Sequence, residues 1–291
     1  MDLKKILGLM IIAILIIVAM YIIFGGEPSN NGDEPDVGWL DMSYLRDELN
    51  SRSSEYTLHY KRTSDPEVIN DIKIPQTSLL IIIGFDENLT ASEILAIQEF
   101  VEAGGKVIIA DDHGYANQFS LLYGVEFKPY RLIANYDDNA SIFIPLTITL
   151  GEEEYTVITN EPEGLEVAED DSIMILGASL YSLNERKYSA LDINKNNNID
   201  GTDIQGPIPV AVEYTDPDSG GKILFFSNTG IFTDKQWGVT SVDPKYIGFE
   251  YQNAEFVQAL IPYLLGDTGT HIIYDESKQT EDFSGHIYIY S

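Results

Sequence analysis

The chain has 291 residues, with 17 Lys and Arg against 47 Asp and Glu, so its formal net charge is −30. It contains no cysteine, which excludes disulfides, thiolate zinc sites and cysteine nucleophiles. The shortage of cationic residues argues against nucleic acid as a partner. Hydrophobic residues make up 44% of the chain and aromatic residues 11%, which is typical of a globular protein.

The N-terminal region is a candidate membrane anchor. Residues 6–26 (ILGLMIIAILIIVAMYIIFGG) carry no charge, and a helix of this length matches a hydrocarbon core about 30 Å thick. Lys4 and Lys5 precede the run and acidic residues follow it, which predicts a cytoplasmic N-terminus with the rest of the chain outside. A cleaved signal peptide is the alternative. The length of the run and the absence of an A-x-A site favour an uncleaved anchor.

These features predict a single-pass protein of the cell membrane, whose partners are the membrane itself and other proteins at the cell surface. We expect an anchor at 1–26, a flexible acidic stalk at 27–38, an extracytoplasmic domain at 39–270 and a strand-like tail at 271–291. Sequons begin at Asn88 and Asn139 in the predicted exterior domain.

Helical and strand patterns alternate in the first part of the exterior domain. YLRDEL (44–49) predicts a helix, TLHYKR (57–62) a strand, and LLIIIG (79–84) a strand buried on both faces. Thr90 and Glu93 form a capping box before a helix that ends at Gly104-Gly105, and KVIIAD (106–111) predicts another buried strand. Strand, helix and strand together indicate a right-handed βαβ unit on a parallel sheet.

The chain becomes strand-rich after residue 140. Apolar alternation and turn residues predict the following strands, and an amphipathic pattern predicts a helix over 253–264. The part at about 140–215 therefore extends the α/β sheet or is inserted into it. The predicted strands are 142–150, 155–159, 172–179, 209–214 and 222–228.

The segment DINKNNNIDGTDI (192–204) has the oxygen spacing of an EF-hand loop and resembles dockerin-type loops. Asn197 occupies the position usual for Gly, which Asn tolerates because it visits the left-handed region. The sequence predicts a weak, structural calcium site; the alternative is a solvated turn, because Asn, Asp and Gly favour turns. The expected ligands are Asp192, Asn194, Asn196, Asn198, Asp200 and Asp203.

Candidate catalytic residues follow the strand at 106–111, at the edge where open α/β sheets bind ligands. Asp111, Asp112 and His113 could do acid–base work, but no G-x-S-x-G nucleophile elbow is present in the sequence. The alternative is that the two aspartates cap the next turn while His113 lies at the surface. Ligand capture without turnover would use Asn117, Asn228 and Thr229.

Several segments together resemble uncharacterised, membrane-anchored archaeal proteins with a class I glutamine-amidotransferase-like domain. These segments are 79–84, 92–112, 191–212, 222–232 and 253–266. The resemblance implies a flavodoxin-like α/β fold. True amidotransferases use a cysteine nucleophile, which this chain lacks. We therefore expect a non-catalytic binding or scaffolding domain stabilised by calcium, with an extracellular hydrolase that uses Asp111, Asp112 and His113 as the alternative.

Overall fold

The computed structural model describes residues 45, 56–61, 67–70, 72, 74–85, 88–136, 139–141, 143–160, 162–184, 186–232, 251–266 and 285–290. All of them belong to one unit, Val37–Ser291. The predicted membrane span, the stalk and all of the predicted helix 44–49 except Leu45 lie outside the described residues. Within the described residues, no helix has the length and apolar character needed to cross a membrane.

The main sheet joins nine described strands in the order β1-β14-β2-β3-β13-β12-β9-β6-β7. The neighbours from β1 to β13 run parallel, and those from β13 to β7 run antiparallel. The parallel part consists of β1 Tyr56–Lys61, β14 Gly285–Tyr290, β2 Ser78–Ile83, β3 Lys106–Ala110 and β13 Lys222–Phe226. The antiparallel part consists of β12 Pro209–Thr215, β9 Ile173–Ala178, β6 Phe143–Leu150 and β7 Glu153–Asn160.

The predicted βαβ unit is confirmed. Every residue of β2 is buried, and β2 pairs in parallel with β3. Between them lies helix α4, Ala91–Glu102, which begins with the predicted capping box of Thr90 and Glu93. Gly105 follows the helix, and a Cβ on it would lie 2.4 Å from the ring of Phe100. Glycine is therefore needed there because the chain passes directly over that ring.

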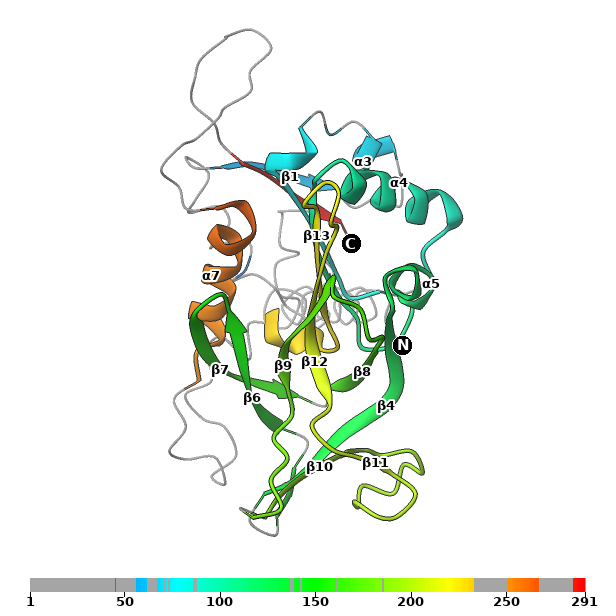
Figure 1. The fold of residues 1–291 in the computed structure, drawn as a ribbon, viewed down its shortest axis with the longest axis vertical. Coiled ribbons are helices and arrows are strands. Elements are labelled where there is room, and N and C mark those ends of the chain that lie inside the picture. Colours follow the sequence, from blue (N-terminus) through cyan, green and yellow to red (C-terminus); the bar gives the residue numbers. More distant parts are fainter. Residues whose placement is uncertain are drawn as a thin grey trace, which may run out of the picture. The chain divides into compact units, whose positions relative to one another are not determined.

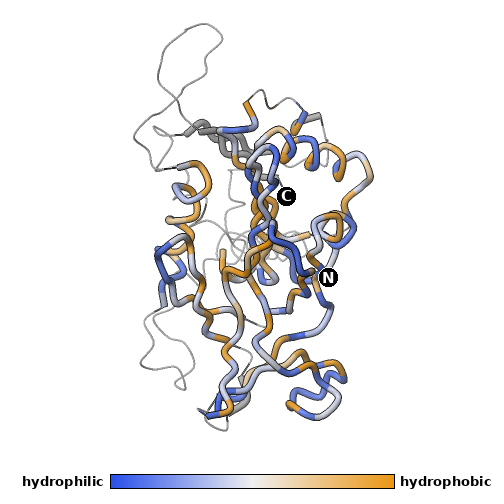
Figure 2. Tube along the Cα trace, in the orientation of Figure 1, coloured by the Kyte–Doolittle hydropathy of each residue, from blue (hydrophilic) through white to orange (hydrophobic). Residues whose placement is uncertain are grey.

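Helices cover the two faces of the parallel part, as Figure 1 shows for α4 and for α7, Asn253–Leu265. Alternate residues of each buried strand belong to two separate hydrophobic clusters, one with α4 and the other with α7. Figure 2 shows the hydrophobic residues gathered along the central strands. Phe256, Leu260, Ile261 and Leu264 of α7 are buried, as the pattern at 253–264 predicts. The arrangement is a mixed α/β fold with one helix layer on each face of the parallel strands.

The strand-rich middle is inserted between β3 and β13, which are neighbours in the sheet. It supplies the antiparallel strands and a second described sheet in the order β11-β10-β4-β5, with β8 paired to β4. Each strand predicted from residue 57 onwards is present, within two residues at either end. The second sheet contains β11 Ile204–Gln205, β10 Lys187–Leu191, β4 Val125–Tyr136 and β5 Asn139–Ser141, and β8 is Glu163–Val167.

Strand β4 is absent from the sequence prediction. It contains Pro129, which argues against a regular central strand. The pairing of β4 with β8 shifts register between Lys128 and Arg131, and from Leu132 onwards β4 pairs with β10. Pro129 therefore lies at the irregular point where β4 passes from one partner to the next.

Two further features complete the fold. β14 lies inside the parallel sheet, between β1 and β2, although it falls in the segment predicted as a tail.

The edge strand β7 is covered by the start of α7. The Asn253 side chain accepts from the backbone N–H of Ile158 at 2.9 Å and donates to the Ile158 carbonyl at 2.9 Å. The remaining short helices are α3 Glu67–Asn70, α5 Asn117–Ser120, η2 Pro75–Thr77, η3 Leu121–Tyr123 and η4 Thr229–Phe232.

Candidate functional site

The carboxyl ends of β3 and β13 form the edge at which the sequence places its candidate site. After β3 the chain turns toward the α4 face, where Ala116 and Phe119 join the cluster packed on that helix. After β13 it turns toward the opposite face, where Ile231 and Phe232 pack with α7. In open α/β sheets, ligands bind at the edge where the connections of neighbouring parallel strands leave toward opposite faces.

Asp111 is fully buried directly after β3 and holds the following turn. One carboxylate oxygen accepts the backbone N–H of His113 at 2.8 Å, and the other accepts that of Ala116 at 2.7 Å. Burial raises the pKa of Asp111, although these two donors act in the opposite direction. Asp111 is therefore a capping residue of the turn that leads into α5.

Asp112 links the loop after β3 to the loop after β13. Its Oδ1 accepts the backbone N–H of Thr229 at 2.8 Å and the side-chain amide of Asn228 at 3.3 Å, while Oδ2 accepts the Thr229 hydroxyl. Burial raises the pKa of Asp112, again opposed by its hydrogen-bond donors. The structure thus brings together three of the predicted residues, and their contacts connect the two loops.

Glu163, the first residue of β8, is an unpredicted member of this group. Its backbone pairs with Ser227, since Glu163 N–H donates to the Ser227 carbonyl at 3.1 Å and the Ser227 hydroxyl donates to the Glu163 carbonyl at 2.8 Å. Within the described residues, its Oε2 is buried without a hydrogen-bond partner. Burial, followed by the charges of Asp112 and Asp111, raises the pKa of Glu163 to about 8. Its carboxyl group is therefore mostly protonated at neutral pH.

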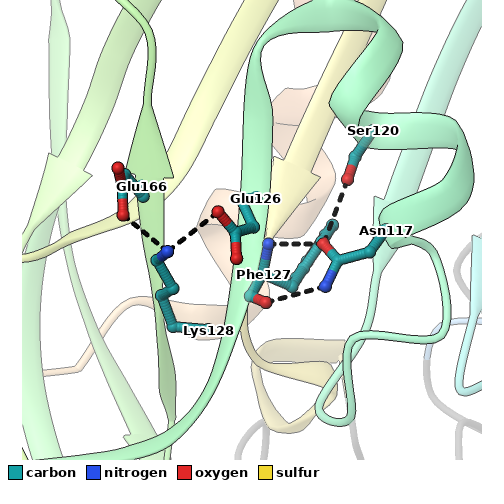
Figure 3. Close-up of polar contacts among 6 residues, drawn as sticks. All are labelled: Asn117, Ser120, Glu126, Phe127, Lys128 and Glu166. Carbon is teal, nitrogen blue, oxygen red and sulfur yellow. Dashed lines mark hydrogen bonds and ion pairs between the residues drawn. The ribbon is translucent and has the colours of Figure 1, made fainter.

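The side chains of two other predicted residues make different contacts. His113 is exposed, with its ring 5.7 Å from that of Tyr115. The Asn117 amide donates to the Phe127 carbonyl at 2.9 Å and accepts the Phe127 N–H at 2.7 Å, as Figure 3 shows. Asn117 is therefore a structural side chain that covers the outer edge of β4.

The calcium-like loop is closed by its own aspartates. Buried Asp192 accepts the backbone N–H groups of Asn196 at 3.0 Å and Asn197 at 2.8 Å. Asp203 accepts those of Ile193 at 3.1 Å and Asp200 at 2.8 Å. Asn197 has φ of 58°, so the residue at the usual Gly position is left-handed, as the sequence predicts.

The remaining ligand candidates converge on Asp200. Its Oδ2 accepts the side-chain amides of Asn194 at 2.9 Å and Asn196 at 2.8 Å. Hydrogen bonds, led by that from the Thr202 hydroxyl, lower the pKa of Asp200. The Asn198 amide instead donates to the Asn196 carbonyl at 2.9 Å.

The oxygen atoms of the loop can hold a hard cation only if the side chains of its asparagines take part. Among the described residues, no group of three or more His, Asp or Glu side chains is placed to hold a metal ion. The Oδ1 atoms of Asn194 and Asn196 each accept one backbone N–H, at 3.1 and 2.7 Å, so each retains a lone pair. These oxygens together with the aspartates provide the all-oxygen chemistry that calcium prefers.

Comparison with known proteins identifies the fold and no activity. No family model matches the chain, and no curated protein matches it. The mmIFT52 N-terminal domain is 12% identical and aligns with a TM-score of 0.53 over 79% of this chain and 92% of its own. A ThuA-like protein from Bacteroides uniformis ATCC 8492 is also 12% identical, with a TM-score of 0.43 over 76% of this chain and 83% of its own. The exo-β-1,4-mannosidase Op5Man5 from Opitutaceae bacterium strain TAV5 is 15% identical, with a TM-score of 0.37 over 77% of this chain and 38% of its own.

Proposed function

We propose that the chain is a membrane-anchored extracytoplasmic domain that binds or scaffolds other proteins at the cell surface without catalysing a reaction. The observation that carries this proposal is the hydrogen bonding at the carboxyl ends of β3 and β13. All the carboxylate oxygens of Asp111 and Asp112 accept structural hydrogen bonds, and His113 is exposed. Asp111 caps its own turn and Asp112 connects two loops, which are positioning roles and not the arrangement of an acid–base pair.

We further propose a flavodoxin-like, class I glutamine-amidotransferase-like architecture for the parallel part. The support is the β2-α4-β3 unit on a parallel sheet with α7 on the other face. The absence of cysteine from the sequence excludes the amidotransferase nucleophile. The exterior location follows from the charges around residues 6–26.

The location can be tested by labelling, because a chain without cysteine gives no background with thiol reagents. Asp218→Cys introduces a thiol in an exposed turn between β12 and β13. We expect a membrane-impermeant maleimide to label this variant on intact cells, with the parent chain as the unlabelled control. Labelling only after lysis would contradict the proposed topology.

We also propose that the loop 192–203 binds one structural calcium ion. Asp192, Asp200 and Asp203, with the asparagines at 194, 196 and 198, would hold it. Extracellular calcium modules bind at about 10⁻⁴–10⁻³ M, so 5 mM calcium should stabilise the full chain by about 1–2 kcal/mol. Thermal unfolding in calcium, magnesium and EDTA measures this, and Asp203→Asn should abolish the effect. Equal melting temperatures in calcium and EDTA would exclude the site.

The alternative function is hydrolysis at the carboxyl ends of β3 and β13, and Glu163 is the observation that favours it. A partly buried carboxyl with a pKa of about 8 beside two aspartates is a group that enzymes use as a general acid. The two proposals are separated by screening the full chain against chromogenic esters, phosphoesters and glycosides. We expect no turnover; activity that is lost in Glu163→Gln would overturn the binding proposal.

A further inference from the structure

Two acceptor sequences for N-linked sugars lie in the predicted exterior domain, and the structure places them differently. Residues 88–90 (NLT) lie in the connection from β2 to α4, outside any strand or helix. Residues 139–141 (NAS) form β5, and each of them pairs with β4 in an antiparallel ladder. Because N-linked sugars are bulky and belong to surface loops, the sequon at 88–90 is the better acceptor.

The packing of Leu89 keeps this sequon at the surface. Leu89 is only 6% exposed and belongs to the hydrophobic cluster on α4, against which Ile94 also packs. These two residues occupy the N′ and N4 positions of a hydrophobic staple, which fixes how the chain enters the helix. Asn88 and Thr90, on either side of Leu89, are both exposed. The acceptor residue and the hydroxyl residue of the sequon are therefore both accessible.

The Asn88 side chain has no structural role among the described residues. None of them donates a hydrogen bond to it or accepts one from it. By contrast, the amides of Asn117 and Asn253 are each bonded to a strand backbone. A sugar on Asn88 would therefore displace no hydrogen bond of the described fold.

Thr90 serves both the helix and the sequon. In the folded chain its hydroxyl donates to the Glu93 carboxylate at 2.6 Å and accepts the Glu93 backbone N–H at 3.3 Å. A transferase that recognises the sequon has to reach the same hydroxyl. Chain segments at the ends of elements open locally far more readily than the whole domain unfolds, so the cap does not withhold the sequon.

We propose that Asn88 carries an N-linked oligosaccharide. Its Nδ2 atom forms a bond to the anomeric carbon of a sugar chain held on a polyprenyl phosphate or pyrophosphate. The bond between that carbon and the phosphate oxygen breaks, the lipid phosphate leaves with the electron pair, and the amide proton passes to a base of the transferase. The inference rests on the proposed exterior location, because this transfer takes place on the outer side of a cell membrane or in the secretory pathway.

The test uses the full chain purified in mild detergent from the cells that produce it. Trypsin cleaves after Lys and Arg, so it separates the two sequons: peptide 74–106 contains Asn88, and peptide 132–186 contains Asn139. We expect peptide 74–106 to be heavier than its sequence by the mass of an oligosaccharide. Fragment spectra should place the added mass on Asn88.

Three variants connect the added mass to the sequon. Asn88→Gln removes the acceptor and should return peptide 74–106 to its sequence mass. Thr90→Asp destroys the sequon but keeps a good N-cap residue, so the sugar should be lost while α4 remains. Thr90→Ser is its matched control, because Ser preserves both the sequon and the cap and should remain modified. Far-ultraviolet circular dichroism spectra equal to that of the parent verify that the variants are folded.

The outcomes separate this inference from the location on which it rests. An unmodified peptide 74–106 in the parent chain would overturn it, and so would an added mass that persists in Thr90→Asp. A sugar on peptide 132–186 alone would support an exterior domain and reject Asn88. External labelling of Asp218→Cys with both peptides unmodified would reject the sugar and leave the exterior location in place.

Discussion

Replacing Glu163 by Gln should stabilise the protein by an amount that grows with pH. An unfolded chain ionises this carboxyl near its ordinary pKa of 4.5, whereas burial and the neighbouring aspartates keep it protonated in the folded chain up to about pH 8. The parent protein therefore loses stability as the pH rises from about 4.5 to about 8, and the loss stays level above that range. The Gln side chain does not ionise, so the variant does not lose stability in this way.

The size of the effect follows from the pKa difference. A shift of this size corresponds to at most about 5 kcal/mol, at roughly 1.4 kcal/mol per pKa unit. Because Glu163 is only partly buried, solvent screening reduces the expected gain at pH 9 to about 1–2 kcal/mol. For a domain of this size, that gain raises the melting temperature by about 3–6 °C.

Thermal unfolding of parent and variant at pH 4.5, 7 and 9 provides the assay. The exposed Glu152→Gln is the matched control for the substitution itself. If the Glu163→Gln curve runs parallel to that of the parent across this range, the burial argument for Glu163 is wrong.

Three substitutions test the other contacts. Thr229→Val removes the hydroxyl donor from the Asp112 carboxylate and should cost about 1–3 kcal/mol in urea unfolding; an unchanged midpoint would show that the contact between the loops contributes nothing. Asn117→Leu removes both hydrogen bonds on the edge of β4 and should cost about 2–3 kcal/mol, measured in the same way. Gly221→Ala places a Cβ 2.0 Å from a carbonyl oxygen of α4 and should lower the melting temperature sharply, whereas Gly201→Ala, with no atom within 4 Å, should be neutral.

The elements that sequence reasoning predicts correctly are those with local signals. The capping box at Thr90, the apolar period of α4 and the continuous run of β2 each depend on neighbouring residues. The left-handed conformation of Asn197 is likewise a property of its own loop. Short-range geometry determines such features, so they can be located from the sequence of neighbouring residues.

Sequence reasoning misses the features that depend on residues distant in the chain. β4 is interrupted by Pro129, and its two ends are stabilised by different strands, so no single periodicity runs through it. Glu163 begins a short strand after a proline, and its raised pKa arises from aspartates about fifty positions earlier in the chain. The contact of Asp112 with Thr229 joins residues 117 positions apart, which no local pattern can indicate.

The position of β14 affects how the domain can be assembled during synthesis. Residues 285–290 are the last of the described strands in chain order, yet they pair with β1 on one side and β2 on the other. Until this segment has been synthesised, β1 cannot pair with the sheet, and the edge of β2 stays open to wrong partners. The slow step of folding is therefore expected to be a late strand insertion, at a time when the rest of the sheet has already formed.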